Sequence, residues 1–242
     1  MTALDLDGQR ITIFGGTSGL GLATAQLAAA QGASVVIASR TEARVAAALE
    51  TLPASAEGHV ADLGTEASIA ALMNDIGAFD HLIFTAGENL VLHELADTDL
   101  GAARGFFETR LWGALAAAKH AAPLLRPGGS IVLMSGSAAA RPQAGWAVAA
   151  AICGAIEAVT RALAVELAPL RVNAVAPGVV RTPLWDGMGA ADRDAMYTGL
   201  ADQLLVGRVG EAADVALGIL QLIANGYATG ITLPIDGGAT LV

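Results

Sequence analysis

This 242-residue chain contains little of what several protein classes require. Cys153 is its only cysteine, which excludes an intramolecular disulfide and a zinc site built from cysteines. Lys119 is its only lysine, and the net charge of −10 argues against a groove for nucleic acid. Aromatic residues make up only 4% of the chain, so few side chains could stack on single-stranded bases.

Long apolar runs are also missing. The most apolar stretch, 144–156, has 13 residues, whereas a helix needs about 20 to span a bilayer. The first ten residues include Asp5 and Asp7 and lack the apolar core of a signal peptide. The four histidines do not show the spacing of metal ligands. We therefore expect a cytoplasmic protein without a membrane segment or a metal site.

Short apolar runs alternate with helical patterns along the whole chain. The expected strands cover 11–14, 34–38, 58–61, 82–84, 130–134, 172–175 and 231–233. The expected helices cover 19–31, 42–51, 65–76, 99–125, 143–168 and 211–224. Strands without polar alternation are buried on both faces. The pattern predicts one doubly wound α/β domain over residues 1–242, with about seven parallel strands, helices on both faces and a ligand at the strands' carboxyl ends.

A glycine-rich turn joins the first expected strand to the first expected helix. Its residues are Gly15, Gly16, Thr17, Ser18, Gly19, Leu20 and Gly21. The glycines allow a tight turn and a close approach of the backbone to a ligand. The free N–H groups and partial positive charge of the following helix N-terminus then favour a diphosphate. We interpret this turn as part of a dinucleotide site.

The end of the second strand indicates which dinucleotide is bound. A site for NAD has a carboxylate there that accepts from the ribose 2′-hydroxyl, but this chain has Ser39 and Arg40. A guanidinium can pair with a 2′-phosphate, which a carboxylate would repel. The residues therefore favour NADP(H) over NAD(H). Asp62, after the third strand, is placed to meet the adenine ring.

Several further motifs resemble the short-chain dehydrogenase/reductase family across essentially the whole chain. They are Asp62-Leu63, Thr85-Ala86-Gly87, 160–164, 171–175, 176–183 with Pro177, Gly178, Val180 and Thr182, and Thr229-Gly230 with 235–238. The resemblance implies a Rossmann domain that forms a homodimer or homotetramer, with Leu63, Ala86 and Gly87 at the cofactor. It also implies that Thr182 holds the nicotinamide carboxamide and that residues 183–210 form a substrate lid.

The catalytic residues of that family are absent. The family uses a serine, a tyrosine and a lysine, with an upstream asparagine. Counting back from 160–164 places the tyrosine position on Ala149 and the lysine position on Cys153. The serine position falls on or next to Gly136, between Ser135 and Ser137, and the asparagine position on Arg110. No other register restores the pair, because Ala201 and Ile231 stand four residues after the two tyrosines, Tyr197 and Tyr227. Losing a positioned general acid slows a reaction by about 10²–10⁴-fold.

Other side chains could supply the missing groups. Arg110 could reach into the vacated space and restore a positive charge beside the cofactor ribose, or it could pair with a neighbour such as Glu108. The candidate proton donors are Ser135, Ser137, Tyr197 on the lid, and Glu88. Cys153 is expected to be an inert thiol in an apolar helix.

The small residues at these positions favour a hydrophobic substrate. We interpret the chain as an NADP(H)-dependent reductase of a hydrophobic ketone or quinone that uses a non-standard route for the proton. One alternative is an inactive dinucleotide-binding scaffold or sensor. Another is a non-redox enzyme that reuses the same pocket.

Overall fold

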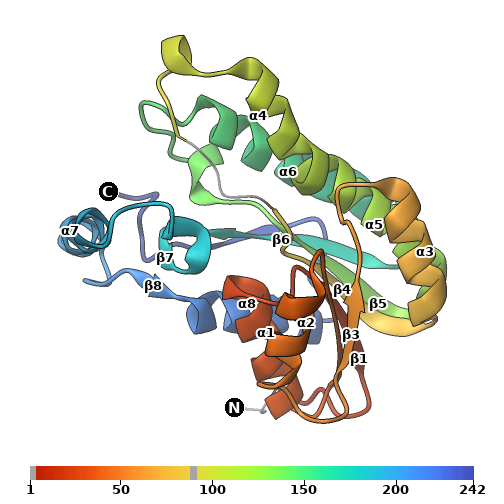
Figure 1. Cartoon of the computed structure of the whole chain (residues 1–242). Coiled ribbons are helices and arrows are strands. Elements are labelled where there is room, and N and C mark those ends of the chain that lie inside the picture. The colour runs from red at the N-terminus through yellow and green to blue at the C-terminus, as the bar shows by residue number, and fades with distance from the viewer. Residues whose placement is uncertain (1–3, 88–91) are drawn as a thin grey trace.

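The computed structural model describes residues 4–87 and 92–242 and confirms the predicted parallel sheet (Figure 1). Its strands are β1 Arg10–Phe14, β2 Ser34–Ser39, β3 Glu57–Val60, β4 Phe79–Phe84, β5 Leu125–Met134, β6 Arg171–Pro177 and β9 Thr232–Ile235. They pair in the order β3-β2-β1-β4-β5-β6-β9, each parallel to its neighbour. The order reverses between β1 and β4, which is where doubly wound sheets bind ligands.

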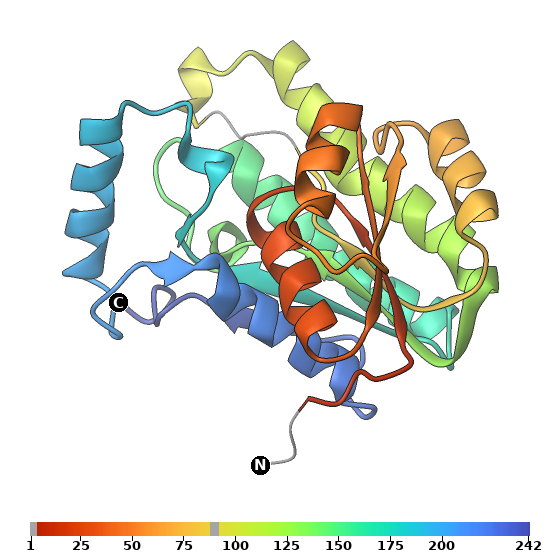
Figure 2. The same ribbon diagram turned by 60° about the horizontal axis from the view of Figure 1, so that its bottom comes forward.

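Helices cover both faces of this sheet (Figures 1 and 2). One layer contains α1 Gly19–Ala30, α2 Glu42–Leu49 and α8 Ala212–Ala224, and the other contains α3 Glu66–Ile76, α5 Ala114–Ala121 and α6 Ala147–Glu166. Side chains of β2 alternate between the layers: Val35 and Ile37 pack with α1 and α8, whereas Val36 and Ala38 pack with α3 and α5. Burial on both faces explains why the strand sequences lack polar alternation.

The segment expected to form one helix over 99–125 is divided. It contains α4 Leu100–Phe107, a π-helical turn Glu108–Gly113, and α5, followed by a short 3-10 turn Ala122–Leu124. Gly113 lies so close to Leu63 that a Cβ atom there would collide with the Leu63 carbonyl oxygen. The π turn presents Arg110 to the carboxyl edge of the sheet, and such turns are frequent at functional sites.

The segment expected to be a lid has its own structure. Strand β7 Val180–Arg181 pairs with β8 Gly210–Glu211, and helix α7 Ala190–Ala201 lies between them in the chain. Figure 1 shows α7 at the end of the molecule away from α3. Tyr197 is buried, with the Arg181 guanidinium 4.3 Å from its ring centroid. This contact attaches α7 to β7.

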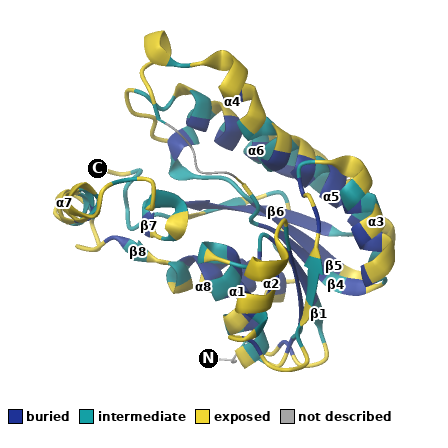
Figure 3. Cartoon of the chain, in the orientation of Figure 1, coloured by how far each residue is buried: buried dark blue, intermediate teal, exposed yellow. Residues whose placement is uncertain are grey.

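Helix α6 is longer than the apolar stretch noted in the sequence. Its 20 residues are long and apolar enough, by length and composition, to cross a membrane. In this structure Ile156 belongs to the core beneath the sheet, and Ala149 and Cys153 are buried beside Ala138. Figure 3 shows that α4 is largely exposed, whereas the buried residues of α6 recur every three or four positions. The pattern is typical of a helix with one face on a protein core.

His81 in β4 makes stability depend on pH. It is 5% exposed, its Nδ1 lies 2.8 Å from Ser130 Oγ, and its Nε2 lies 3.0 Å from Gln9 Oε1. Burial, the larger effect, and the nearby charge of Arg171 together lower its pKa from 6.5 to about 4. The unfolded chain therefore takes up a proton at a higher pH than the folded chain.

We expect the free energy of unfolding to decrease by about 3 kcal/mol as pH falls from 6.5 to 4, because of this one side chain. Urea unfolding at several pH values measures the slope. His81→Asn should flatten the slope in this window, and His93→Asn, at an exposed position, should leave it unchanged. Equal slopes for wild-type protein and His81→Asn would show that His81 is not the titrating group.

Candidate active site

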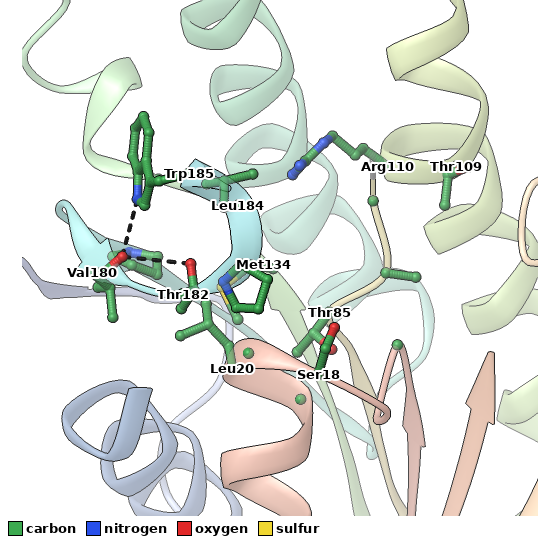
Figure 4. A pocket seen from close by; sticks show the side chains of 18 of the residues that line it. Ser18, Leu20, Thr85, Thr109, Arg110, Met134, Val180, Thr182, Leu184 and Trp185 are labelled. Carbon is green, nitrogen blue, oxygen red and sulfur yellow. Dashed lines mark hydrogen bonds between the residues drawn. The ribbon is translucent and has the colours of Figure 1, made fainter. Parts of the chain in front are cut away.

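A cavity of about 660 Å³ lies at the carboxyl ends of the strands. Its wall is built by the β1–α1 turn, the ends of β2, β4, β5 and β6, the π turn, and the start of the expected lid (Figure 4). It is lined by 15 of the predicted cofactor-binding residues: Gly15, Thr17, Ser18, Gly19, Leu20, Gly21, Ser39, Arg40, Leu63, Ala86, Gly87, Pro177, Gly178, Val180 and Thr182. The cavity also includes the candidate catalytic residues Arg110, Ser135 and Ser137.

The glycine-rich turn has the shape of a phosphate cradle. Gly15 has a φ of 84°, and a Cβ atom there would lie 2.7 Å from the Ala86 nitrogen. A Cβ atom on Gly21 would collide with the Gly15 carbonyl oxygen. The Ser18 side chain makes no capping hydrogen bond at the N-terminus of α1, and the first turn contains no acidic residue. The free N–H groups there suit a diphosphate, so the residues present fit a dinucleotide.

Two arginines lie at the end of β2, where the sequence indicated one. Arg40 follows β2, and Arg44 stands in the first turns of α2; both line the cavity. The sequence reasoning missed Arg44, although its spacing of four residues from Arg40 near a helix start could have indicated it. Two guanidinium groups at this edge strengthen the case for a phosphorylated ribose.

Asp62 lies outside the cavity lining among the described residues. Its Oδ1 accepts a hydrogen bond from the Gly64 nitrogen at 3.0 Å, and its own backbone nitrogen donates to Ser68 Oγ at 2.9 Å. The side chain therefore shapes the turn between β3 and α3. Its contact with an adenine ring stays a prediction.

The positions expected to hold the tyrosine, the lysine and the serine carry small, weakly polar or apolar residues. The cavity lining includes Gly136, Ala149 and Cys153, with Trp146 beside them. Of the part of the chain that the structure describes, no tyrosine or lysine lines this cavity. Lys119 pairs with Glu66 on the surface at 2.6 Å.

The two tyrosines lie elsewhere. Tyr227 is 99% exposed, and Tyr197 is buried under Arg181 beside a second, smaller cavity. Burial also raises the pKa of Tyr197. A role for Tyr197 as proton donor stays a prediction, and it requires a movement of α7. Glu88, another candidate, lies outside the described residues.

Arg110 lines the cavity, and its role beside the cofactor ribose stays a prediction. Its side chain extends from the π turn into the cavity (Figure 4). The guanidinium lies over Gly87, where a Cβ atom would come within 2.7 Å of Cζ. Its charge also lowers the pKa of Cys153, although burial, the larger effect, raises the pKa of that thiol overall. Arg110 therefore places a positive charge beside the residue that stands at the lysine position.

Gly136 and Cys153 lie close together in the cavity wall. A Cβ atom on Gly136 would lie 3.1 Å from Cys153 Sγ, so the two residues accommodate one another. The raised pKa keeps the thiol protonated, which disfavours a nucleophilic role. Among the described residues there is also no group of three or more side chains able to hold a metal ion.

Comparisons with known proteins agree with this geometry. A family profile described as Enoyl-(Acyl carrier protein) reductase matches residues 15–240. The short-chain dehydrogenase/reductase ucsE of an Acremonium species is 35% identical, over 99% of this chain and 98% of its own length. The short-chain reductase protein NovJ of Streptomyces niveus is 32% identical, over 93% of this chain and 92% of its own length.

Solved structures agree with the same architecture. A small-chain dehydrogenase crystallised in complex with NADPH is 42% identical, with a TM-score of 0.87 over 98% of this chain and 100% of that chain. The MalC Reductase/Diels-Alderase from Malbranchea aurantiaca is 30% identical, with a TM-score of 0.90 over 98% of both chains.

Proposed function

Because this chain belongs to the short-chain dehydrogenase/reductase family, we propose that it is an NADP(H)-dependent reductase of a hydrophobic ketone or quinone that delivers its proton by a non-standard route. One observation carries this proposal. The cavity combines a phosphate cradle and two arginines with a reaction end that contains neither tyrosine nor lysine among the described residues.

The residues assigned to the cofactor divide its binding between two ends. The N-terminus of α1 would hold the diphosphate, and Arg40 and Arg44 would pair with the 2′-phosphate. Thr182, Pro177 and Gly178 would hold the nicotinamide end; when bound, NADPH supplies a hydride. The neighbour crystallised with NADPH supports this choice of cofactor. The intact nicotinamide end favours redox chemistry over a scaffold, which would not need it.

The reaction end is suited to an apolar carbonyl compound. Its apolar lining comes from Leu92, Met134, Ala138, Ala149, Leu184 and the rings of Trp146 and Trp185. The indole nitrogen of Trp185 donates to the Val180 carbonyl oxygen at 3.0 Å, which fixes that ring. Arg110 would supply the positive charge beside the ribose that a lysine supplies elsewhere in the family. A charge in a cavity of low polarity acts more strongly than in water.

We also propose that the protein is cytoplasmic, binds neither nucleic acid nor membranes, and forms a homodimer or homotetramer. The net charge of −10 argues against binding to nucleic acid. Small residues along α6 would allow close helix–helix contact in an oligomer: Ala147, Ala151, Gly154, Ala155 and Ala158.

Consumption of NADPH, followed at 340 nm against a panel of hydrophobic ketones and quinones, tests the reaction. We expect turnover with some members of the panel, and a loss of about tenfold or more in Arg110→Ala, because a charge-assisted contact contributes about 1.5–3 kcal/mol. Arg104→Ala, at an exposed position on α4, is the matched control. The absence of turnover across the panel would contradict the proposal.

The second candidate function is a non-redox reaction in the same cavity. The missing tyrosine and lysine favour it, and a structural neighbour is named both a reductase and a Diels-Alderase. This alternative predicts that NADPH binds without being consumed and that the product has the same oxidation state as the substrate. Mass spectrometry of the products distinguishes the two, since reduction adds two hydrogen atoms. An inactive scaffold would bind NADPH and yield no product.

A further inference from the structure

We propose that Glu157 on α6 delivers the proton of the reaction through Ser135. This inference rests on the proposed reductase function, and it names the residues that would supply the proton. Ser135 follows β5 and lines the cavity. Its Oγ lies 3.1 Å from Glu157 Oε1 and 3.2 Å from the Cys153 carbonyl oxygen, and it donates to these acceptors. A cavity-lining hydroxyl is thus connected directly to a carboxyl group.

The position of Glu157 follows from the geometry of the helix. Residues four apart share one face of a helix, so Glu157 lies one turn beyond Cys153 on the side that faces the end of β5. Its side chain is half-buried, so one side can exchange protons with water while the other contacts Ser135. The path from solvent to the cavity therefore needs only these two side chains.

Glu157 forms no salt bridge with the described residues, since none of their arginines, lysines or histidines lies within 4.0 Å of its carboxylate. Charged residues on the elements packed around Glu157 include Arg161, four residues further along α6, and Glu108 and Arg110 on the π turn, which contacts α6. Cys153 stands between Glu157 and Arg110, and both act electrostatically on its thiol.

The relay balances with the reduction of a carbonyl group. A reduced nicotinamide, when bound, would supply the hydride with its electron pair for the new C–H bond, and the π electrons of the C=O bond would move to oxygen. That oxygen takes the proton of Ser135 Oγ, which takes the proton of the protonated Glu157 carboxyl group. A proton from bulk solution then restores the carboxyl group, so the net reaction consumes the hydride and one proton. Ser135 touches the substrate, and Glu157 acts through it.

Glu157→Gln removes the ability to deliver a proton while it retains the hydrogen bond to Ser135. The amide oxygen still accepts a hydrogen bond from Ser135, so the contact and the fold are retained, but the amide does not titrate. Glu166→Gln is the matched control, because it is the same change at an exposed position on the same helix. Calorimetric titration of each variant with NADPH checks that cofactor binding is unchanged.

The decisive readout is the pH profile of kcat with an active ketone. We expect wild-type kcat to decrease as pH rises above the range in which a carboxyl group is protonated. Glu157→Gln should lose this dependence and about tenfold to a hundredfold of its activity at low pH, and Glu166→Gln should match the wild type. Ser135→Ala combined with Glu157→Gln should be no slower than either change alone, because the two residues act in series.

Carboxyl ¹³C NMR of the protein without cofactor gives a second readout. The Glu157 resonance, identified by its loss in Glu157→Gln, should titrate at a different pH in Ser135→Ala. An unchanged pH profile in Glu157→Gln, or an unchanged titration in Ser135→Ala, overturns the relay while leaving the reductase intact. Failure of the wild-type protein to consume NADPH at any pH overturns the proposed function and the relay with it.

Discussion

We expect Arg40→Ala to lower the affinity for NADPH by about ten- to a hundredfold and to leave the affinity for NADH nearly unchanged. The expected effect follows from the loss of a charge-assisted contact with a 2′-phosphate, which contributes about 1.5–3 kcal/mol. NADH has no such phosphate, so the same change removes nothing from its binding. Calorimetric titration with both cofactors measures the difference directly.

Two variants sharpen this test. Arg44→Ala should show the same selectivity with a smaller effect, since Arg44 also lines the cavity. Arg104→Ala removes an equal charge from an exposed position on α4 and should change neither affinity. Equal losses for NADPH and NADH in Arg40→Ala would mean that the arginine does not bind the 2′-phosphate. The choice of NADP(H) would then have no support from this edge of the sheet.

Rebuilding the family's catalytic residues should have the other large effect. We expect the triple variant Gly136→Ser, Ala149→Tyr and Cys153→Lys to reduce a hydrophobic ketone about a hundredfold faster than the wild type, because a positioned general acid contributes about 10²–10⁴-fold. All three positions line the cavity, so the new side chains would face the substrate. Gly136 and Cys153 must change together, because a Cβ atom on residue 136 lies 3.1 Å from the present sulfur.

A matched variant distinguishes the effect of the tyrosine hydroxyl group from the effect of adding a large ring. Replacing Ala149 by phenylalanine in the same background adds a ring of similar size without the hydroxyl group. It should remain near wild-type turnover, and thermal unfolding should confirm that both variants are folded. Similar rates for the tyrosine and phenylalanine variants would contradict the assignment of the tyrosine position to Ala149.

The elements that form the cofactor half of the site could be predicted from local sequence. Buried strands such as β1 and β2 are short apolar runs, and the glycine turn lies between a strand and a helix. Each of these signals is contained within about ten adjacent residues. The carboxyl ends of parallel strands lie at one edge of the sheet. Residues that directly follow several predicted strands could therefore be predicted to lie together at the cofactor.

The elements that the sequence did not reveal depend on contacts between distant segments. The π turn depends on the packing of Gly113 against Leu63, 50 positions earlier in the chain. Tyr197 is the one buried residue of α7, so this helix has no apolar stripe and its sequence carried no helical pattern. The hydrogen bond between Ser135 and Glu157 connects the end of β5 to α6, and the two residues are 22 positions apart in the sequence. None of these contacts leaves a periodic signal in the sequence.

Transfer of deuterium from NADPH labelled at nicotinamide C4 tests the central claim most directly. The account predicts that wild-type protein, which has Ala149 and Cys153 in its cavity, transfers one deuterium to the carbonyl carbon of a hydrophobic ketone. Mass spectrometry of the alcohol product, with each C4 position labelled in turn, detects this transfer. NADPH that binds tightly and yields no labelled product from either position would contradict the account.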